Sequence, residues 1–279
     1  DHHGNTGLYY YHDAHRFAFA SSKKALLALG AVPKKPNLLR ISQLLTAWPG
    51  DGIQTGYEHI LRLPPAHYLV VNTSGLSTNR YWFPENDSEL RLKTDDDYLE
   101  AFMEAFTRAV SVRLRSQRPV GVTLSGGLDS GAVTAVAAGV LRERGESMLA
   151  FTSTPVSDPS QYTDVGRFGD ETRLAAETAR HSGNVEHILV PAGEVTPLAA
   201  IERMLWVHDE PGHAAGNQYW LMALLEAAQQ RGVGSLLVES GEPAAADFSG
   251  YSVGGAVTTT LPAGTLVENA SSPTAGYTT

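Results

Sequence analysis

The chain has 279 residues, of which 42% are hydrophobic, enough for one large globular domain or two ordinary ones. Its formal net charge is -9, and no window collects the Lys/Arg clusters and interleaved aromatics that nucleic-acid grooves or anionic membranes require. We therefore expect no nucleic-acid partner. Cysteine is absent, which excludes disulfides, zinc-thiolate sites and a cysteine nucleophile within these residues.

No apolar run approaches the roughly 18 to 20 residues that a membrane-spanning helix needs. The start, "DHHGNTGLYYYHD", lacks the basic head and apolar centre of a signal peptide. We therefore expect a cytoplasmic location and no membrane partner. The chain opens on Asp1 instead of a methionine, which we interpret as a fragment or a processed product.

The first 85 residues or so predict short antiparallel strands. Four aromatic-rich or apolar segments are punctuated by Gly, Pro, Asn and Asp, and are expected as strands: 7–13, 16–22, 67–73 and 80–85. Between them, the segment 21–30, "SSKKALLALG", predicts one short helix.

The segment 94–116 predicts a long helix that opens a second domain. Thr94 is the expected capping residue, and acids fill the first turn. Apolar side chains recur at helical spacing: Leu99, Phe102, Phe106, Val110 and Leu114. We place the boundary between the domains at 84–90, "PENDSEL".

Beyond that boundary, apolar runs alternate with helical segments. Four strands are expected: 120–124, 149–154, 185–191 and 235–239. Four helices are expected to begin at Ser130, Glu171, Pro197 and Asn217. This alternation predicts an α/β fold with right-handed crossovers and a buried parallel sheet. Residues 252–279 contain no Lys or Arg and are dominated by Thr, Gly, Ala, Ser and Pro, and we assign no fold to them.

Small and polar residues mark the carboxyl ends of the expected strands, where ligands bind in an open parallel sheet. They read "SGGLDS" (125–130), "TSTP" (152–155), "VPAG" (190–193) and "ESGE" (239–242). In the first of these loops, Gly126 and Gly127 would let backbone N–H groups approach phosphate oxygens. Ser125 and Ser130 offer hydroxyls. Asp129 would repel bare phosphate, which predicts a bridging magnesium ion. Alternatively, Asp129 or Ser130 only caps the helix and the glycines only turn the chain.

The pattern S-G-G-L-D-S resembles the pyrophosphate-binding loop of ATP pyrophosphatases, and "RPVGVTLSGGLDS" most closely resembles glutamine-hydrolysing asparagine synthetases. This resemblance implies an α/β domain with a parallel, doubly wound sheet of the ATP-pyrophosphatase (adenine nucleotide alpha hydrolase-like) type. It also implies a preceding, partial α+β glutaminase domain of the N-terminal-nucleophile type. We expect the glutaminase part over 1–88, a truncated synthetase domain over 89–251, and an unassignable tail over 252–279.

The glutaminase resemblance rests on two upstream segments. "DHHGNTGLYY" is similar to R-D-x-x-G-x-x-P-L-Y, and "ASSKKALLAL" is similar to A-S-E-x-K-A-L, although Gly7 replaces a proline and Ser22 a glutamate. The resemblance implies that Asp1 binds the amino group of glutamine. The family's nucleophilic cysteine would precede Asp1, so we expect no glutamine hydrolysis by this chain alone.

The nucleotide site implied by the resemblance has two halves. Thr123 and Ser153 match backbone contacts to the nucleotide, Asp129 matches a magnesium ligand, and the loop residues match pyrophosphate ligands: Ser125, Gly126, Gly127 and Ser130. The second half, "SGEPAAADFSGY", resembles S-G-E-G-x-D-E-x-F-G-G-Y, where the first three positions hold ATP or assist at the adenylate: Ser240, Gly241 and Glu242. Ala245 and Ala246 replace the acidic pair of that pattern, so we expect an altered second half-site.

Three other groups carry weaker signals. Asp170 and Glu171 resemble a D-E-x-x-x-A segment, and ordinary first-turn acids are the alternative. We interpret His187 as a strand histidine with a hydrogen-bond partner in preference to a catalyst. A short loop gathers possible metal ligands that match no standard spacing: Asp209, Glu210, His213 and Asn217.

The resemblance implies attack of a substrate carboxylate on ATP, release of pyrophosphate, and displacement of AMP from the acyl-adenylate by ammonia. We expect L-aspartate to be converted to L-asparagine with nitrogen from glutamine, because relatives that close β-lactams or cyclise lasso peptides often carry tyrosine in place of Glu242. Those reactions stay open as alternatives, as does a catalytically inactive nucleotide-binding or scaffold domain. The expected partners are ATP, Mg²⁺, aspartate, and glutamine or ammonia, with a homodimer as the candidate assembly.

Overall fold

The computed structural model describes residues 1–4, 6–46, 48, 50–83, 90–159, 163, 169–193, 195–210, 216, 219–238, 259–261 and 265–268. The helices are α1 (Lys23–Leu27), α2 (Leu38–Leu45), α3 (Asp95–Ser111), α4 (Leu128–Glu143), α5 (Thr172–Ser182), α6 (Pro197–His208) and α7 (Tyr219–Gln230). The first strands are β1 (Tyr9–His12), β2 (Phe17–Ala20), β3 (Leu61–Arg62), β4 (His67–Asn72) and β5 (Gly75–Arg80). The later strands are β6 (Val120–Thr123), β7 (Met148–Thr154), β8 (Val185–Pro191), β9 (Ser235–Leu237), β10 (Thr259–Leu261) and β11 (Thr265–Glu268).

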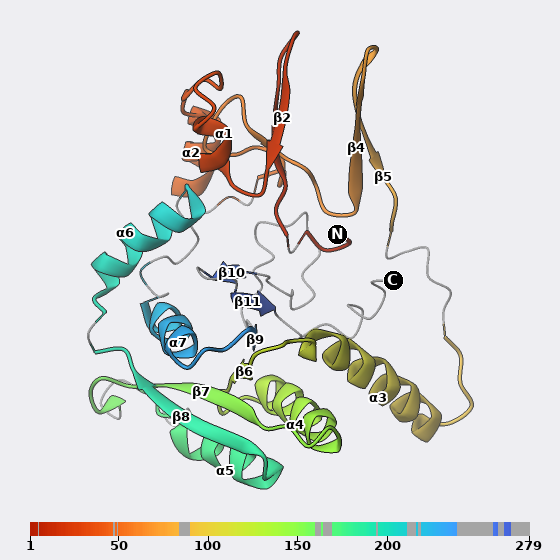
Figure 1. Ribbon diagram of the computed structural model, residues 1–279, viewed down its shortest axis with the longest axis vertical. Coiled ribbons are helices and arrows are strands. Elements are labelled where there is room, and N and C mark those ends of the chain that lie inside the picture. Colours follow the sequence, from red (N-terminus) through yellow and green to blue (C-terminus); the bar gives the residue numbers. More distant parts are fainter. Residues whose placement is uncertain are drawn as a thin grey trace.

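Residues 1–83 form a small α+β unit in which the antiparallel sheet β2-β1-β3 stands beside the hairpin β4–β5 (Figure 1). Helix α1 packs on the sheet through a buried cluster: Tyr11, Leu26, Leu27, Val32 and Ile60. The strands predicted at 7–13, 16–22 and 67–73 are confirmed as β1, β2 and β4, and the helix predicted within 21–30 is confirmed as α1.

Two features of this unit differ from the sequence prediction. The strand predicted at 80–85 is wrong over residues 81–83, which form no strand, while 84–85 lie outside the described residues. The two-residue turn between Asn72 and Gly75 fixes the register of the hairpin, so that β5 ends opposite the first residue of β4. Helix α2 was not predicted; Asn37 caps it by accepting a hydrogen bond from the Arg40 N–H at 3.1 Å.

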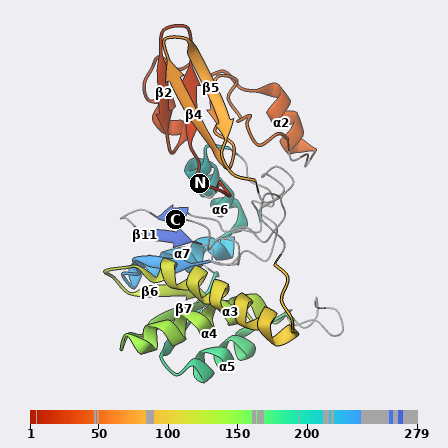
Figure 2. The ribbon, with the colours of Figure 1, turned by 90° about the vertical axis from the view of Figure 1, so that its right-hand side faces the viewer.

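The second unit is a sheet in the order β10-β11-β9-β6-β7-β8, in which all neighbours are parallel except β10 and β11. Helices α3, α4 and α5 share one hydrophobic cluster on one face, and α7 packs on the other face (Figure 2). This confirms the predicted α/β fold with a parallel, doubly wound sheet. Residues 252–279, to which no fold was assigned, contribute β10 and β11.

Helix α3 begins where the sequence predicted. Thr94 and Asp97 form a reciprocal capping box, with N–O distances of 3.0 and 3.1 Å. Of the five predicted apolar positions, those in the C-terminal half of the segment are buried: Phe106, Val110 and Leu114. Leu99 and Phe102 continue the same helical spacing but are 59% and 48% exposed, because only the later turns of α3 lie in the core cluster.

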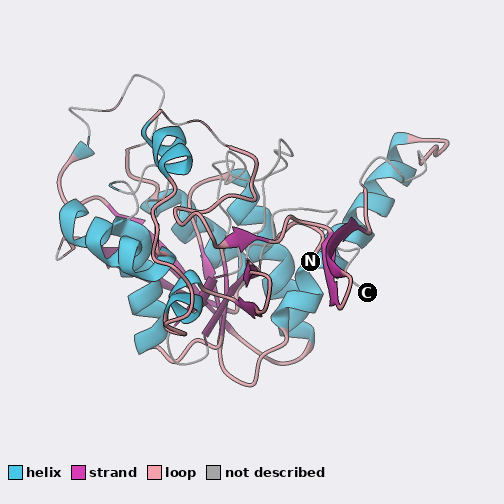
Figure 3. Cartoon of the chain, turned by 90° about the horizontal axis from the view of Figure 1, so that it is seen from above, coloured by secondary structure: helices cyan, strands magenta, loops and turns pink. Residues whose placement is uncertain are grey.

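The order of the strands fixes where a ligand site can form. The chain proceeds from β6 through β7 to β8 in one direction, and then returns to place β9 on the other side of β6. The direction of winding therefore reverses between β6 and β9, and the carboxyl ends of these two strands flank the crevice in which open α/β sheets bind ligands. Figure 3 shows the central strands from above, with helices around them. Within the described residues, none of the helices has the length and apolarity to cross a membrane.

Candidate functional site

The loop 124–127 connects β6 to α4 at this reversal point. The Thr123 hydroxyl lies 3.5 Å from the Leu237 carbonyl oxygen and so joins the ends of β6 and β9. The buried Thr152 hydroxyl, from β7, donates a hydrogen bond to the Leu124 carbonyl at 2.6 Å. Three neighbouring strand ends therefore hold the start of the loop, and Thr152 is a contributor that the sequence did not reveal.

Two serines close the loop on itself. Their hydroxyl oxygens, Ser125 Oγ and Ser130 Oγ, lie 2.7 Å apart. Ser130 Oγ also accepts the Ser125 N–H at 3.2 Å, and Ser125 Oγ accepts the Gly127 N–H at 3.1 Å. In this structure both hydroxyls therefore organise the loop, and Ser130 is buried.

Helix α4 begins at Leu128, two residues before the predicted start at Ser130. Its N-cap is Gly127, in an extended conformation, and no side chain among the described residues caps it. The alternative in which Asp129 or Ser130 only caps the helix is therefore wrong, because both residues lie inside the first turn. The first N–H groups of a helix have no partner within it, and the helix dipole adds partial positive charge there. The end of β6 thus presents an anion-attracting helix terminus.

Gly126 lies at a close approach of the start of α5. A Cβ atom at this position would lie 3.1 Å from the Cβ atoms of Glu171 and Leu174, closer than ordinary side chains pack. The Gly126 N–H donates to the Glu171 carboxylate at 3.2 Å. The negatively charged Glu171 side chain thus accepts a hydrogen bond from the loop backbone, as a bound anion would. This contact was missed, because Glu171 is 45 residues further along the chain.

Asp129 is exposed in the first turn of α4, next to the loop. Among the described residues there is no cluster of three or more His, Cys, Asp or Glu side chains that could hold a metal ion. A magnesium ion at Asp129 would need further oxygen ligands besides this carboxylate.

Three other predicted positions lie near this sheet edge. Ser153 is close to the end of β7 and half-buried. Asp170 precedes α5 and accepts the Thr172 N–H at 2.9 Å, and hydrogen bonding by Thr172 lowers the pKa of its carboxyl. His187 Nε2 lies 2.8 Å from the Thr152 hydroxyl, as interpreted from the sequence, and burial lowers the pKa of its ring.

Other predicted residues lie elsewhere or outside the described residues. Asp209 and Glu210 contact lysines of the 1–83 unit. The remaining candidates fall outside the described residues: His213, Asn217, Ser240, Gly241 and Glu242. Asp1 uses its carboxylate within its own turn, where it accepts the N–H groups of His3 and Thr6 at 3.0 and 2.9 Å.

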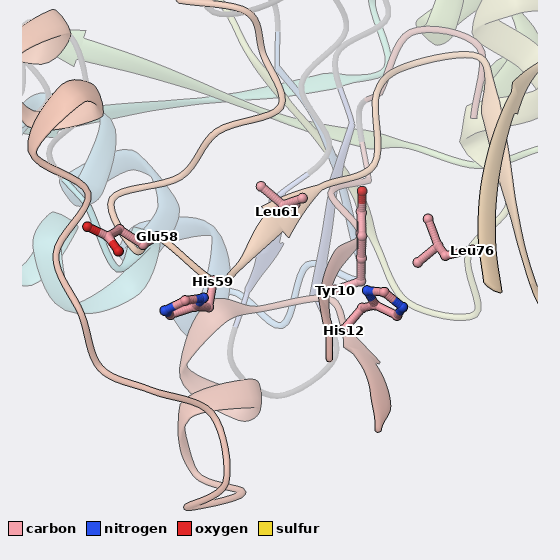
Figure 4. Close-up of a pocket in the computed structure, with 6 residues that line it drawn as sticks. All are labelled: Tyr10, His12, Glu58, His59, Leu61 and Leu76. Carbon is pink, nitrogen blue, oxygen red and sulfur yellow. The ribbon is translucent and has the colours of Figure 1, made fainter. Parts of the chain in front are cut away.

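A separate cavity of about 210 Å³ lies in the 1–83 unit (Figure 4). Its lining residues are Tyr10, His12, Glu58, His59, Leu61 and Leu76. None of them belongs to the strand ends around the loop, so this cavity is distinct from the site at β6 and β9.

Two family models match the chain. The model described as asparagine synthase matches residues 101–266, which is more than half of the chain, and the model described as glutamine amidotransferase domain matches residues 1–82. The first match includes the β6 loop, and the second coincides with the small α+β unit.

Two curated relatives have similar levels of identity. An amidase of Gibberella zeae is 28% identical over 90% of this chain, which covers 37% of the amidase. The glutamine-hydrolysing asparagine synthetase 3 of Bacillus subtilis is 29% identical over 88% of this chain, which covers 39% of the synthetase. The chain therefore spans less than half the length of either protein.

A solved structure, the NH3-dependent NAD synthetase from Campylobacter jejuni, overlaps 51% of this chain and 55% of that one, with 14% identity and a TM-score of 0.31. That similarity is too low to support a conclusion. The match of the asparagine synthase model over more than half of the residues is sufficient: the chain belongs to the asparagine synthase family.

Proposed function

We propose that this chain carries the ATP-binding half of an amide-forming ligase, which activates a carboxylate as an acyl-adenylate and transfers ammonia to it. The observation that carries the proposal is the Gly126–Gly127 loop, which joins β6 to the N-terminus of the 16-residue helix α4 at the point where the sheet reverses its winding. Backbone N–H groups, a helix terminus and a close-packed glycine meet there, as a pyrophosphate site requires.

In this proposal ATP places its phosphates on the loop, with contacts from six residues: Thr123, Ser125, Gly126, Gly127, Ser130 and Ser153. The substrate carboxylate attacks the α-phosphorus, the bond to the β-phosphate oxygen breaks, and pyrophosphate leaves with the electron pair. The N–H groups of the loop stabilise the charge that develops on pyrophosphate. Ammonia then attacks the acyl carbon, loses a proton and displaces AMP.

Asp129 would hold magnesium together with phosphate oxygens, and the ion would neutralise part of the pyrophosphate charge. Ser240 and Gly241 would contact ATP from the end of β9, and Glu242 would assist at the adenylate. Asp1 would bind the amino group of glutamine in the glutaminase part, which we assign to 1–88, with the synthetase part at 89–251.

L-aspartate is the substrate we propose, with L-asparagine as the product. A second candidate is a related ligase that activates another carboxylate. It is favoured by the amidase of Gibberella zeae, which matches this chain at 28% identity, against 29% for the Bacillus subtilis synthetase.

Exchange of labelled pyrophosphate into ATP tests the proposal, because adenylate formation is reversible. The 279-residue chain would be incubated with ATP, Mg²⁺ and labelled pyrophosphate, with aspartate, with other carboxylic acids, or without acid, and Asp129→Asn would serve as the matched loop variant. Exchange that requires aspartate and is lost in the variant supports the proposal, and exchange with a different acid supports the second candidate. ATP binding without exchange for any acid would instead identify a nucleotide-binding domain.

A further inference from the structure

Two acidic residues at the C-terminal end of α6 contact two lysines at the start of α1, in the other unit of the chain. Glu210 Oε1 lies 3.2 Å from Lys23 Nζ, and Asp209 Oδ1 lies 3.5 Å from Lys24 Nζ. Figures 1 and 2 both show α6 directly beneath the 1–83 unit. We call these four residues, Lys23, Lys24, Asp209 and Glu210, the interdomain clamp.

Each ion pair of the clamp has one buried member. The Lys23 side chain is 2% exposed and that of Asp209 is 6% exposed. A buried ammonium or carboxylate is tolerated only when it has partners of opposite charge and hydrogen bonds, because desolvation costs several kcal/mol per ion. Lys23 Nζ also lies over the Tyr9 ring, 4.7 Å from its centroid. The two units therefore satisfy each other's charges where they meet.

The acidic side chains also bind the backbone of the other unit. Asp209 Oδ2 accepts the Lys24 N–H at 2.9 Å, and Glu210 Oε2 accepts the Gly56 N–H at 3.0 Å. Two amide groups of the 1–83 unit therefore depend on acceptors more than 150 residues further along the chain. Trp206 adds a third contact, since Lys24 Nζ lies 3.9 Å from the centroid of its ring and also donates to its carbonyl oxygen.

The backbone at Asp209 has a conformation that most side chains disfavour. Asp209 caps α6 in the left-handed region, with φ 61°, where glycine is the residue without a steric penalty. The carboxylate explains an aspartate at this position, because glycine would have no acceptor for the Lys24 N–H.

From this geometry we propose that the interdomain clamp fixes the 1–83 unit on α6 and couples the stability of the two units. Helix α6 packs on α7, and α7 leads into β9 at the reversal point of the sheet. Through α6 and α7, the clamp thus links the 1–83 unit to β9, whose carboxyl end flanks the candidate site. The proposal concerns the assembly of the chain and does not depend on which reaction the site catalyses.

Hydrogen exchange of individual amides tests the contacts one at a time in the 279-residue chain. Asp209→Gly removes the carboxylate and suits the left-handed backbone, and Glu210→Ala removes the second acceptor. We expect the Lys24 amide to exchange at least about tenfold faster in the first variant and the Gly56 amide in the second. The Arg40 amide, which donates to Asn37 within one unit, is the control and should not change. Unchanged exchange at Lys24 and Gly56 would overturn the proposal.

A double-mutant cycle tests the coupling itself. Glu210→Gln leaves the buried Lys23 without its ion-pair partner, and Lys23→Met leaves the half-buried Glu210 without its own. The double variant removes both charges. Each single variant should lower the folding equilibrium constant. We expect the decrease in the double variant to be at least about tenfold smaller than the product of the two single fold-decreases. The exposed pair Lys35–Glu58, with side chains 63% and 34% exposed within the 1–83 unit, provides the control cycle through Lys35→Met and Glu58→Gln. Coupling no larger than in that control would overturn the proposal. If a single variant fails to fold, the exchange experiment still decides.

Discussion

Replacing Gly126 by alanine should damage both the stability of the chain and its binding of ATP. The added Cβ would lie 3.1 Å from Glu171 Cβ, Leu174 Cβ and Leu174 Cδ1, so either the loop or the start of α5 must shift by a few tenths of an ångström. Overpacking of this kind costs about 1–3 kcal/mol of the free energy of unfolding. A displaced Gly126 N–H would also lose the hydrogen bond that we propose it donates to phosphate. Such a bond is worth about 1.5–3 kcal/mol for a charged acceptor, which is roughly a tenfold to hundredfold loss of ATP affinity.

The control is the same substitution at Gly139, in the middle of α4, where no atom lies within 4 Å of an added Cβ. Gly139→Ala should raise the free energy of unfolding by up to about 1 kcal/mol, because alanine has the higher helix propensity, and leave ATP affinity unchanged. Urea unfolding and isothermal titration with Mg-ATP would measure both quantities. Equal behaviour of the two variants would refute the close approach of α5 as the reason for Gly126.

Three further predictions concern single side chains. Glu171→Gln should raise the affinity for inorganic pyrophosphate several-fold in a titration without metal. In the parent chain the Glu171 carboxylate accepts the Gly126 N–H and would repel a phosphate that binds there. Unchanged or lower affinity would contradict this. Thr152→Val should lower the free energy of unfolding by about 1–3 kcal/mol, since the buried Leu124 carbonyl loses its side-chain donor, whereas Thr152→Ser should cost less; equal losses in urea unfolding would argue against that bond. The hydrogen bond from the Tyr11 hydroxyl, followed by others, holds the pKa of Asp13 well below its ordinary value. A lowered carboxyl pKa contributes stability above the unfolded-state pKa of about 4, and this stability is lost as pH falls towards the folded-state pKa. Asp13→Asn should therefore destabilise the chain at pH 7, and its difference from the parent should shrink between about pH 5 and pH 2.

The parts of the fold that local sequence determines were predictable. The β6–loop–α4 segment combines an apolar strand, two glycines and a helical apolar pattern, and each of these signals acts within a few residues. The start of α4 was still placed two residues late, because capping rules search for a polar side chain and the observed cap is Gly127. The strand that follows β4 was also misplaced. The aromatic residues Tyr81 and Phe83 favoured a strand at 80–85, whereas the more polar segment 75–80 pairs with β4.

The features that depend on distant residues were not predictable. Glu171 was recognised only by its resemblance to a family segment, and nothing in its spacing indicated a bond to Gly126. Asp209 and Glu210 were weighed as metal ligands, yet their partners are Lys24 and Lys23, whose positions follow only from how the two units pack. Pairing of β11 with β9 likewise depends on a free sheet edge, which no local pattern marks.

The placement of ATP on the β6 loop can be tested most directly by following backbone amides in the NMR spectrum during titration with pyrophosphate and with Mg-ATP. The amides of Gly126, Gly127 and Leu128 should show the largest shifts, because they lie in the loop and at the N-terminus of α4. Shifts confined to the cavity around Tyr10 and His59, or no shifts at saturating ligand, would contradict a phosphate site at the reversal point of the sheet.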